Sequence, residues 1–78
     1  MHSHCTAIIY LREPARPGVR ELLGSMLRLL RGVRQVEFVP AESLITVGFD
    51  HEETGLAEIV RAIEDAGPAV SSVAQRAA

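Results

Sequence analysis

The chain has 78 residues, of which 47% are hydrophobic and 23% are charged, and its net charge is −2. This length leaves room for one hydrophobic core, so we expect a single domain over residues 1–78. The acidic balance and the low aromatic content, 4%, argue against a nucleic-acid-binding protein. The apolar stretches are too short to cross a bilayer, so we expect no membrane insertion.

Two features of the sequence favour a cytoplasmic location. The first residues, MHSHC, lead directly into a strand-like segment and lack the regions of a secretory signal. Cys5 is the only cysteine, so no intramolecular disulfide can form, which suits a reducing compartment. We therefore expect a soluble protein that is stabilised by packing alone.

The first half of the chain has the pattern of a strand, a helix and a second strand. Residues 5–11 (CTAIIYL) are rich in β-branched and aromatic types, which favour a strand. The loop that follows contains prolines, and Pro17 suits the first position of a helix. Apolar residues then recur at three- and four-residue spacing, which predicts an amphipathic helix ending near Gly32. Residues 33–39 (VRQVEFV) predict the second strand.

The second half begins with a hairpin and continues into another helix. Residues 40–43 are turn-forming types, and residues 44–49 (LITVGF) predict a third strand that pairs with the second. Thr54 can cap a second helix that stops at Gly67-Pro68. The apolar positions of this helix are Leu56, Ile59, Val60 and Ile63.

A short strand over residues 69–73 completes the order βαββαβ. Right-handed crossovers fold this order into an α+β, ferredoxin-like sandwich. The expected sheet has four antiparallel strands in the order 4-1-3-2, with both helices on one face. Residues 1–4 and 74–78 are expected to be flexible ends.

About half of the chain carries a set of core and turn residues that occur together in one known family. They are Gly32, Val33, Val36, Phe38, Ile45, Val47, Phe49, Asp50, Ile59 and residues 62–67 (AIEDAG). With them the chain resembles the heavy-metal-associated domains of metal chaperones and metal ATPases. The resemblance implies the ferredoxin-like fold and the binding of soft metals such as copper(I), or of zinc and cadmium. Because these positions serve the fold, they indicate architecture more than activity.

The loop that holds the metal in this family differs here. Family members bind the ion on the two thiolates of a Cys-x-x-Cys loop between the first strand and the first helix, because soft ions prefer sulfur. In this chain the loop reads REPARPG (residues 12–18) and contains neither Cys nor His. Arg12 and Arg16 would also repel a cation. The resemblance therefore assigns no metal ligand to this loop.

The side chains that favour soft or borderline metals lie at two other places in the sequence. They are His2, His4, Cys5 and His51. In the strand order 4-1-3-2, the start of the first strand lies beside the end of the third. His4 and Cys5 should therefore approach Asp50 and His51 within about 5.5 Å. We expect these four ligands to form a relocated metal site, with Asp50 or Glu52 as a further oxygen ligand.

A mixed thiolate and imidazole set suits zinc first, and then copper or nickel. We therefore expect a transition-metal-binding or metal-delivery protein, either a monomer or a metal-bridged homo-oligomer, with a metal-transport ATPase or another protein domain as its partner. The same residues also have a structural interpretation. The histidines would then belong to a flexible end and an ordinary loop, and Cys5 would be a small apolar residue of a strand.

The alternative function is a metal-free docking module that acts with a metal transporter or as a homo-oligomer. The first 36 residues carry six arginines and two glutamates, whereas the remaining residues carry two arginines and eight acidic residues. This asymmetry favours docking through complementary charges. The expected basic residues are Arg20, Arg28, Arg31 and Arg34, and the acidic ones are Glu58, Glu64 and Asp65.

An enzyme is not expected. The conceivable nucleophile and base are Cys5 with His4 or His51, and the sequence offers no group to stabilise an oxyanion. A domain of this size also has little concave surface for a substrate. We therefore expect no catalytic residue in this chain.

Overall fold

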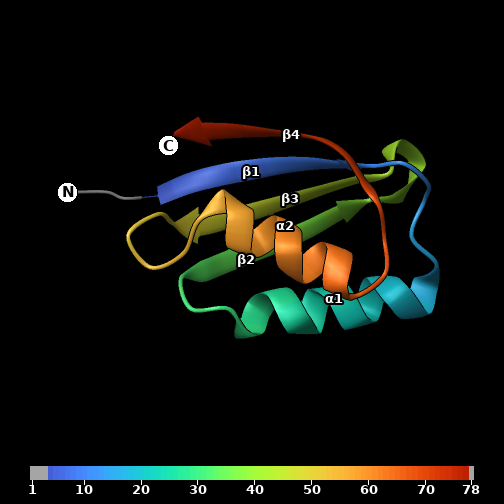
Figure 1. Cartoon of the computed structure of the whole chain (residues 1–78), viewed down its shortest axis with the longest axis horizontal. Helices are drawn as coiled ribbons and strands as arrows, with labels where there is room; N and C mark the ends of the chain where they lie inside the picture. Colours follow the sequence, from blue (N-terminus) through green and yellow to red (C-terminus); the bar gives the residue numbers. More distant parts are fainter. Residues whose placement is uncertain (1–3, 78) are drawn as a thin grey trace.

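The computed structural model describes residues 4–77, apart from the side chain of Pro40. Its elements are β1 (His4–Leu11), α1 (Pro17–Leu29), β2 (Val33–Val39), the 3-10 turn η1 (Pro40–Glu42), β3 (Leu44–Asp50), α2 (Leu56–Asp65) and β4 (Val70–Ala77). Every pairing is antiparallel, and the strands lie in the order β2-β3-β1-β4. Both helices cover the same face of the sheet (Figure 1). The predicted ferredoxin-like architecture is therefore confirmed.

The core lies between the sheet and the two helices, and the other face of the sheet is open. On β1 the buried residues alternate with more exposed ones, as a half-covered strand requires. Leu23 and Leu27 of α1, and Ile59 and Ile63 of α2, are fully buried one helical turn apart, so each helix contributes one apolar stripe. No polar or charged side chain within residues 4–77 is buried. Packing of apolar side chains therefore holds this fold together.

The strands β1, β3 and β4 extend beyond their predicted ends. β1 begins at His4 and β3 ends at Asp50, because these two residues pair with each other. β4 runs on to Ala77, which pairs with Cys5, so residues 74–77 form a strand where a flexible tail was expected. β4 extends this far because backbone hydrogen bonds to β1 continue along β1 as far as Cys5, whatever side chains β4 carries.

The helix ends also differ from the predictions. α1 stops at Leu29, because Leu30 already has extended backbone angles and Gly32 has a positive φ of 90°. The prediction that Thr54 caps α2 is wrong: Gly55 is the N-cap residue, and no side chain caps the helix. The backbone N–H of Thr54 instead donates to the carbonyl oxygen of Asp50 at 3.1 Å, which closes the turn after β3.

Candidate metal centre

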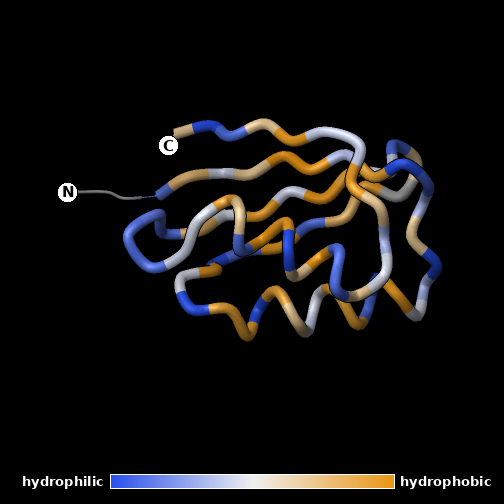
Figure 2. Tube along the Cα trace, in the orientation of Figure 1, coloured by the Kyte–Doolittle hydropathy of each residue, from blue (hydrophilic) through white to orange (hydrophobic). Residues whose placement is uncertain are grey.

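The start of β1 lies beside the end of β3, as the strand order predicted. His4 is paired with Asp50, and Cys5 with Phe49. His51 follows Asp50 directly and is an exposed turn residue. Figure 2 shows that this turn between β3 and α2 is hydrophilic. The fold therefore brings the chain segments of His4 and His51 to the same end of the sheet.

His4 and Cys5 lie on opposite faces of the sheet. Cys5 is 4% exposed and belongs to the core, and the Gln75 side-chain amide donates to its Sγ at 3.7 Å. His4 is exposed on the open face, where its ring lies over Gly48: a Cβ at that position would be 3.4 Å from both Cε1 and Nε2 of the imidazole. The backbone of β1 therefore separates the imidazole of His4 from the thiol of Cys5.

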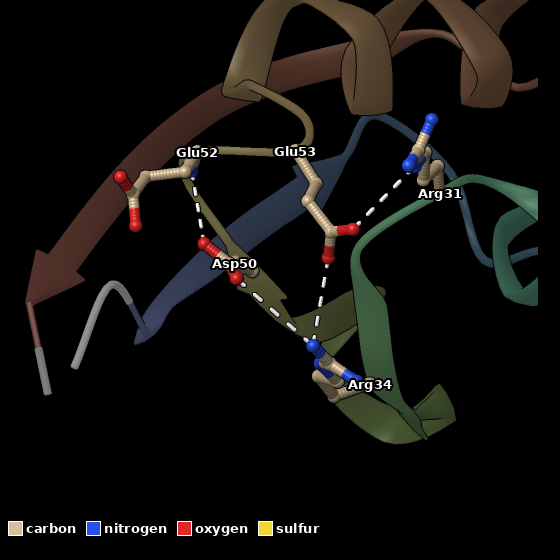
Figure 3. Close-up of polar contacts among 5 residues, drawn as sticks. All are labelled: Arg31, Arg34, Asp50, Glu52 and Glu53. Carbon is tan, nitrogen blue, oxygen red and sulfur yellow. Dashed lines mark hydrogen bonds and ion pairs between the residues drawn. The ribbon is translucent and has the colours of Figure 1, made fainter. Parts of the chain in front are cut away.

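The carboxylate of Asp50 already has partners. The backbone N–H of Glu52 donates to its Oδ1 at 2.9 Å, and the guanidinium of Arg34 lies 3.9 Å from its Oδ2 (Figure 3). Arg34 also pairs with Glu53 at 3.5 Å, and Glu53 pairs with Arg31 at 3.4 Å. This ion-pair network joins the loop between α1 and β2 to the turn between β3 and α2. An ion bound through Asp50 would have to compete with Arg34.

Sequence reasoning missed this role of Arg34, although a signal was present. Arg34 lies at the start of β2, and β2 is antiparallel to β3. A residue at the start of β2 must therefore lie near the residues at the end of β3, among them Asp50. Asp50 was expected to be available as a further oxygen ligand, but its carboxylate pairs with Arg34.

We expect the ion-pair network to contribute little to stability. Substituting Glu53→Gln should lower the free energy of unfolding by less than about 1 kcal/mol, because the side chains of Arg31 and Arg34 are largely exposed to water. The loss should shrink further at high salt. Urea-induced unfolding at two ionic strengths measures it, with Glu21→Gln on the exposed side of α1 as control. A salt-independent loss of several kcal/mol would contradict this expectation.

The three predicted ligands that the structure describes are not arranged as a group that could hold a metal ion; they are His4, Cys5 and His51. Within residues 4–77, no group of three His, Cys, Asp or Glu side chains is arranged to hold a metal ion. His2 lies outside the described residues, so the complete set of His2, His4, Cys5 and His51 stays a prediction. Neither α1 nor α2, the two α-helices within residues 4–77, is long and apolar enough to cross a membrane.

No protein-family model and no curated protein matches this sequence. Several solved structures superpose on it over almost their whole length. A copper-binding domain from HMA7, a P-type ATPase, has a TM-score of 0.80 at 18% identity and covers 91% of this chain and 96% of its own. A protein from Bacillus anthracis str. Ames that is proposed to bind copper ions has a TM-score of 0.81 at 25% identity, with coverage of 91% and 100%.

Oxidized MerP from Ralstonia metallidurans CH34 also superposes, with a TM-score of 0.78 at 19% identity and coverage of 87% and 94%. This chain has the fold of the heavy-metal-associated domains. Its single cysteine leaves no Cys-x-x-Cys loop in that fold. The heavy-metal-associated fold is therefore combined here with an arginine-containing loop between β1 and α1.

Proposed function

We propose that this chain is a transition-metal-binding domain whose ion binds at the start of β1. The observation that carries the proposal is the pairing of His4 with Asp50, because it brings an exposed imidazole beside the residue that precedes His51. His2 is two positions before His4 in sequence. The proposed ligand set is His2, His4 and His51. Cys5 joins it as the fourth ligand only if the start of β1 rearranges around the ion, because its thiol is buried on the opposite face.

The chemistry of these donors supports a borderline ion. Neutral imidazole binds zinc, copper and nickel, and a thiolate strengthens all three. The preference for zinc rests on the donor set alone, whereas the similar structures from HMA7 and Bacillus anthracis are named for copper. The ion would be cargo, and its recipient a metal-transport ATPase or another protein domain.

Titration of the tag-free protein with Zn²⁺, Cu⁺ and Ni²⁺ tests this proposal. Substituting His4→Ala should weaken binding at least about tenfold, since losses of this size follow even when a supporting residue of a metal site is removed. Isothermal titration calorimetry measures the affinity. Gln35→Ala is the matched control, because Gln35 lines the same hollow on the open face as His4. Equal affinities for the His4→Ala variant and the unmodified chain would end the proposal.

The Cys5→Ala variant then separates two forms of the site. Cys5 is turned into the core, so a site built on the open face should keep most of its affinity without the thiol. A loss as large as that of His4→Ala would mean that the start of β1 rearranges around the ion. In both cases the metal remains bound at this end of the fold.

The second candidate function is a metal-free docking module. The observation in its favour is that Arg20 and Arg28 have no ion-pair partner among the described residues, whereas Arg31 and Arg34 are engaged by Glu53 and Asp50. The basic surface available to a partner is therefore smaller than the sequence predicted. A chain that binds none of the three metals, but forms a salt-sensitive complex with a transporter domain, would select this function.

A further inference from the structure

A pocket of about 410 Å³ lies at the end of the fold opposite to His4. It is formed by the loop between β1 and α1 and the loop between α2 and β4, which lie together in Figure 1. A hydrogen bond of 3.0 Å from the N–H of Arg12 to the carbonyl oxygen of Ala69 ties the two loops to each other. The volume is within the range of pockets that hold small molecules, roughly 300–1,000 Å³.

The walls of this pocket are apolar apart from three charged side chains. Pro14, Val19 and Pro68 are among the residues that form the apolar part. Arg12 and Arg16 supply two guanidinium groups, and Glu13 supplies one carboxylate. A pocket that combines apolar walls with a few charged groups at its rim is typical of a site for a ligand with both characters.

The two arginines of the pocket are available to a ligand. Both are exposed, and neither has an ion-pair partner among residues 4–77. α1 begins directly behind them at Pro17, without a side-chain cap and without an acidic residue in its first turn. The positive end of the helix therefore adds to the charge of the two guanidinium groups, and together they outweigh the single negative charge of Glu13.

We propose that this pocket binds a carboxylate carried on an apolar body. Arg12 and Arg16 would hold the carboxylate, since a planar guanidinium matches its two oxygens. The apolar walls would contact the body of the ligand. The loop at the position where the family resemblance implies a metal site in other members would thus bind an organic anion in this chain. The carboxylate could come from a free aliphatic acid or from the end of a peptide, and the experiment distinguishes these sources.

The first test is a titration of the full chain with hexanoate, followed by amide NMR shifts. Saturable shifts are expected at Ala15, Val19 and Ala69, and hexanol at the same concentration should cause much smaller ones. Substituting Arg12→Gln together with Arg16→Gln should weaken hexanoate binding at least about tenfold. The matched control is Arg61→Gln with Arg76→Gln, which removes the same charge from exposed positions elsewhere. This control should bind hexanoate nearly as well as the unmodified chain.

Two further variants of the experiment sharpen the result. Glu13→Gln should tighten hexanoate binding, because it removes the one negative charge that lines the pocket. An apolar peptide with a free C-terminus should bind, and its amidated form should not, if a peptide is the natural source. Hexanoate binding without peptide binding would assign the pocket to a free acid.

Three outcomes would overturn the proposal. The first is the absence of saturable amide shifts with both hexanoate and the peptide that has a free C-terminus. The second is equal binding of hexanol and hexanoate. The third is an equal loss of hexanoate affinity in the two double-arginine variants. None of these outcomes affects the metal titration, because the pocket and His4 lie at opposite ends of the fold. A failure of the metal proposal likewise leaves the hexanoate result unchanged.

Discussion

The Phe49→Ala variant is expected to lose about 3–5 kcal/mol of unfolding free energy, because it removes a large aromatic side chain from the core. Phe49 has no exposed surface and is the largest of the fully buried side chains. It lies on β3, the strand between β2 and β1, so its ring is enclosed by both neighbouring strands and by the helices. Its removal leaves a cavity that a close-packed interior fills only in part.

The consequence is severe because the chain is short. Typical stabilities of about 0.05–0.15 kcal/mol per residue give a domain of this size roughly 4–12 kcal/mol in total. The loss therefore amounts to about a quarter or more of the total, and it unfolds the domain where the total lies at the lower end of this range. Urea-induced unfolding followed by circular dichroism measures the loss. Tyr10→Ala is the control, because Tyr10 is 41% exposed on β1 and its loss should be about 1 kcal/mol or less. A Phe49→Ala variant whose stability nearly equals that of the unmodified chain would contradict this account of the core.

The architecture could be predicted because each element follows from local patterns. Residues 5–11 are rich in β-branched and aromatic types, which favour a strand, and the three- and four-residue spacing in α1 has the period of a helix. Gly32 and Gly67 mark the ends of the helices, and both have positive φ values. Element ends were less predictable: β4 extends to Ala77 only because β1 offers a partner there, which the sequence of β4 alone does not show.

For the candidate metal centre, the sequence predicted which residues pair across the strands, but the contacts of their side chains were not predicted. Strand order was sufficient to place His4 opposite Asp50. The separation of His4 from Cys5 also follows from the sequence, because neighbouring residues of a strand face opposite sides. Applying that rule would have divided the proposed ligands between the two faces. The pairing of Asp50 with Arg34 also had a signal in the predicted hairpin, because β2 is antiparallel to β3, but the hairpin was not used to place Arg34.

Gly32→Ala is expected to have the largest effect on stability after Phe49→Ala. Gly32 has a φ of 90°, and a left-handed conformation of this kind costs an L-residue about 1–2 kcal/mol. An added Cβ would also lie 2.7 Å from the Cβ of Glu53 and 3.2 Å from the carbonyl oxygen of Asp50, so the backbone must shift. That shift weakens the hydrogen bond of 2.8 Å from the Asp50 N–H to the Gly32 carbonyl oxygen.

Two other glycines separate the contributions of conformation and contact. Gly67 has a φ of 120° but no atom within 4 Å of an added Cβ, so Gly67→Ala should lose only the conformational part. Gly18 has neither constraint and lies in the first turn of α1, so Gly18→Ala should be neutral or stabilising by up to about 1 kcal/mol. Urea-induced unfolding of the three variants should therefore rank Gly18→Ala as the most stable, then Gly67→Ala, and Gly32→Ala as the least stable. Equal free energies of unfolding for the Gly32→Ala and Gly67→Ala variants would contradict this account, because they would mean that the turn after β3 moves away from the added Cβ without loss of stability.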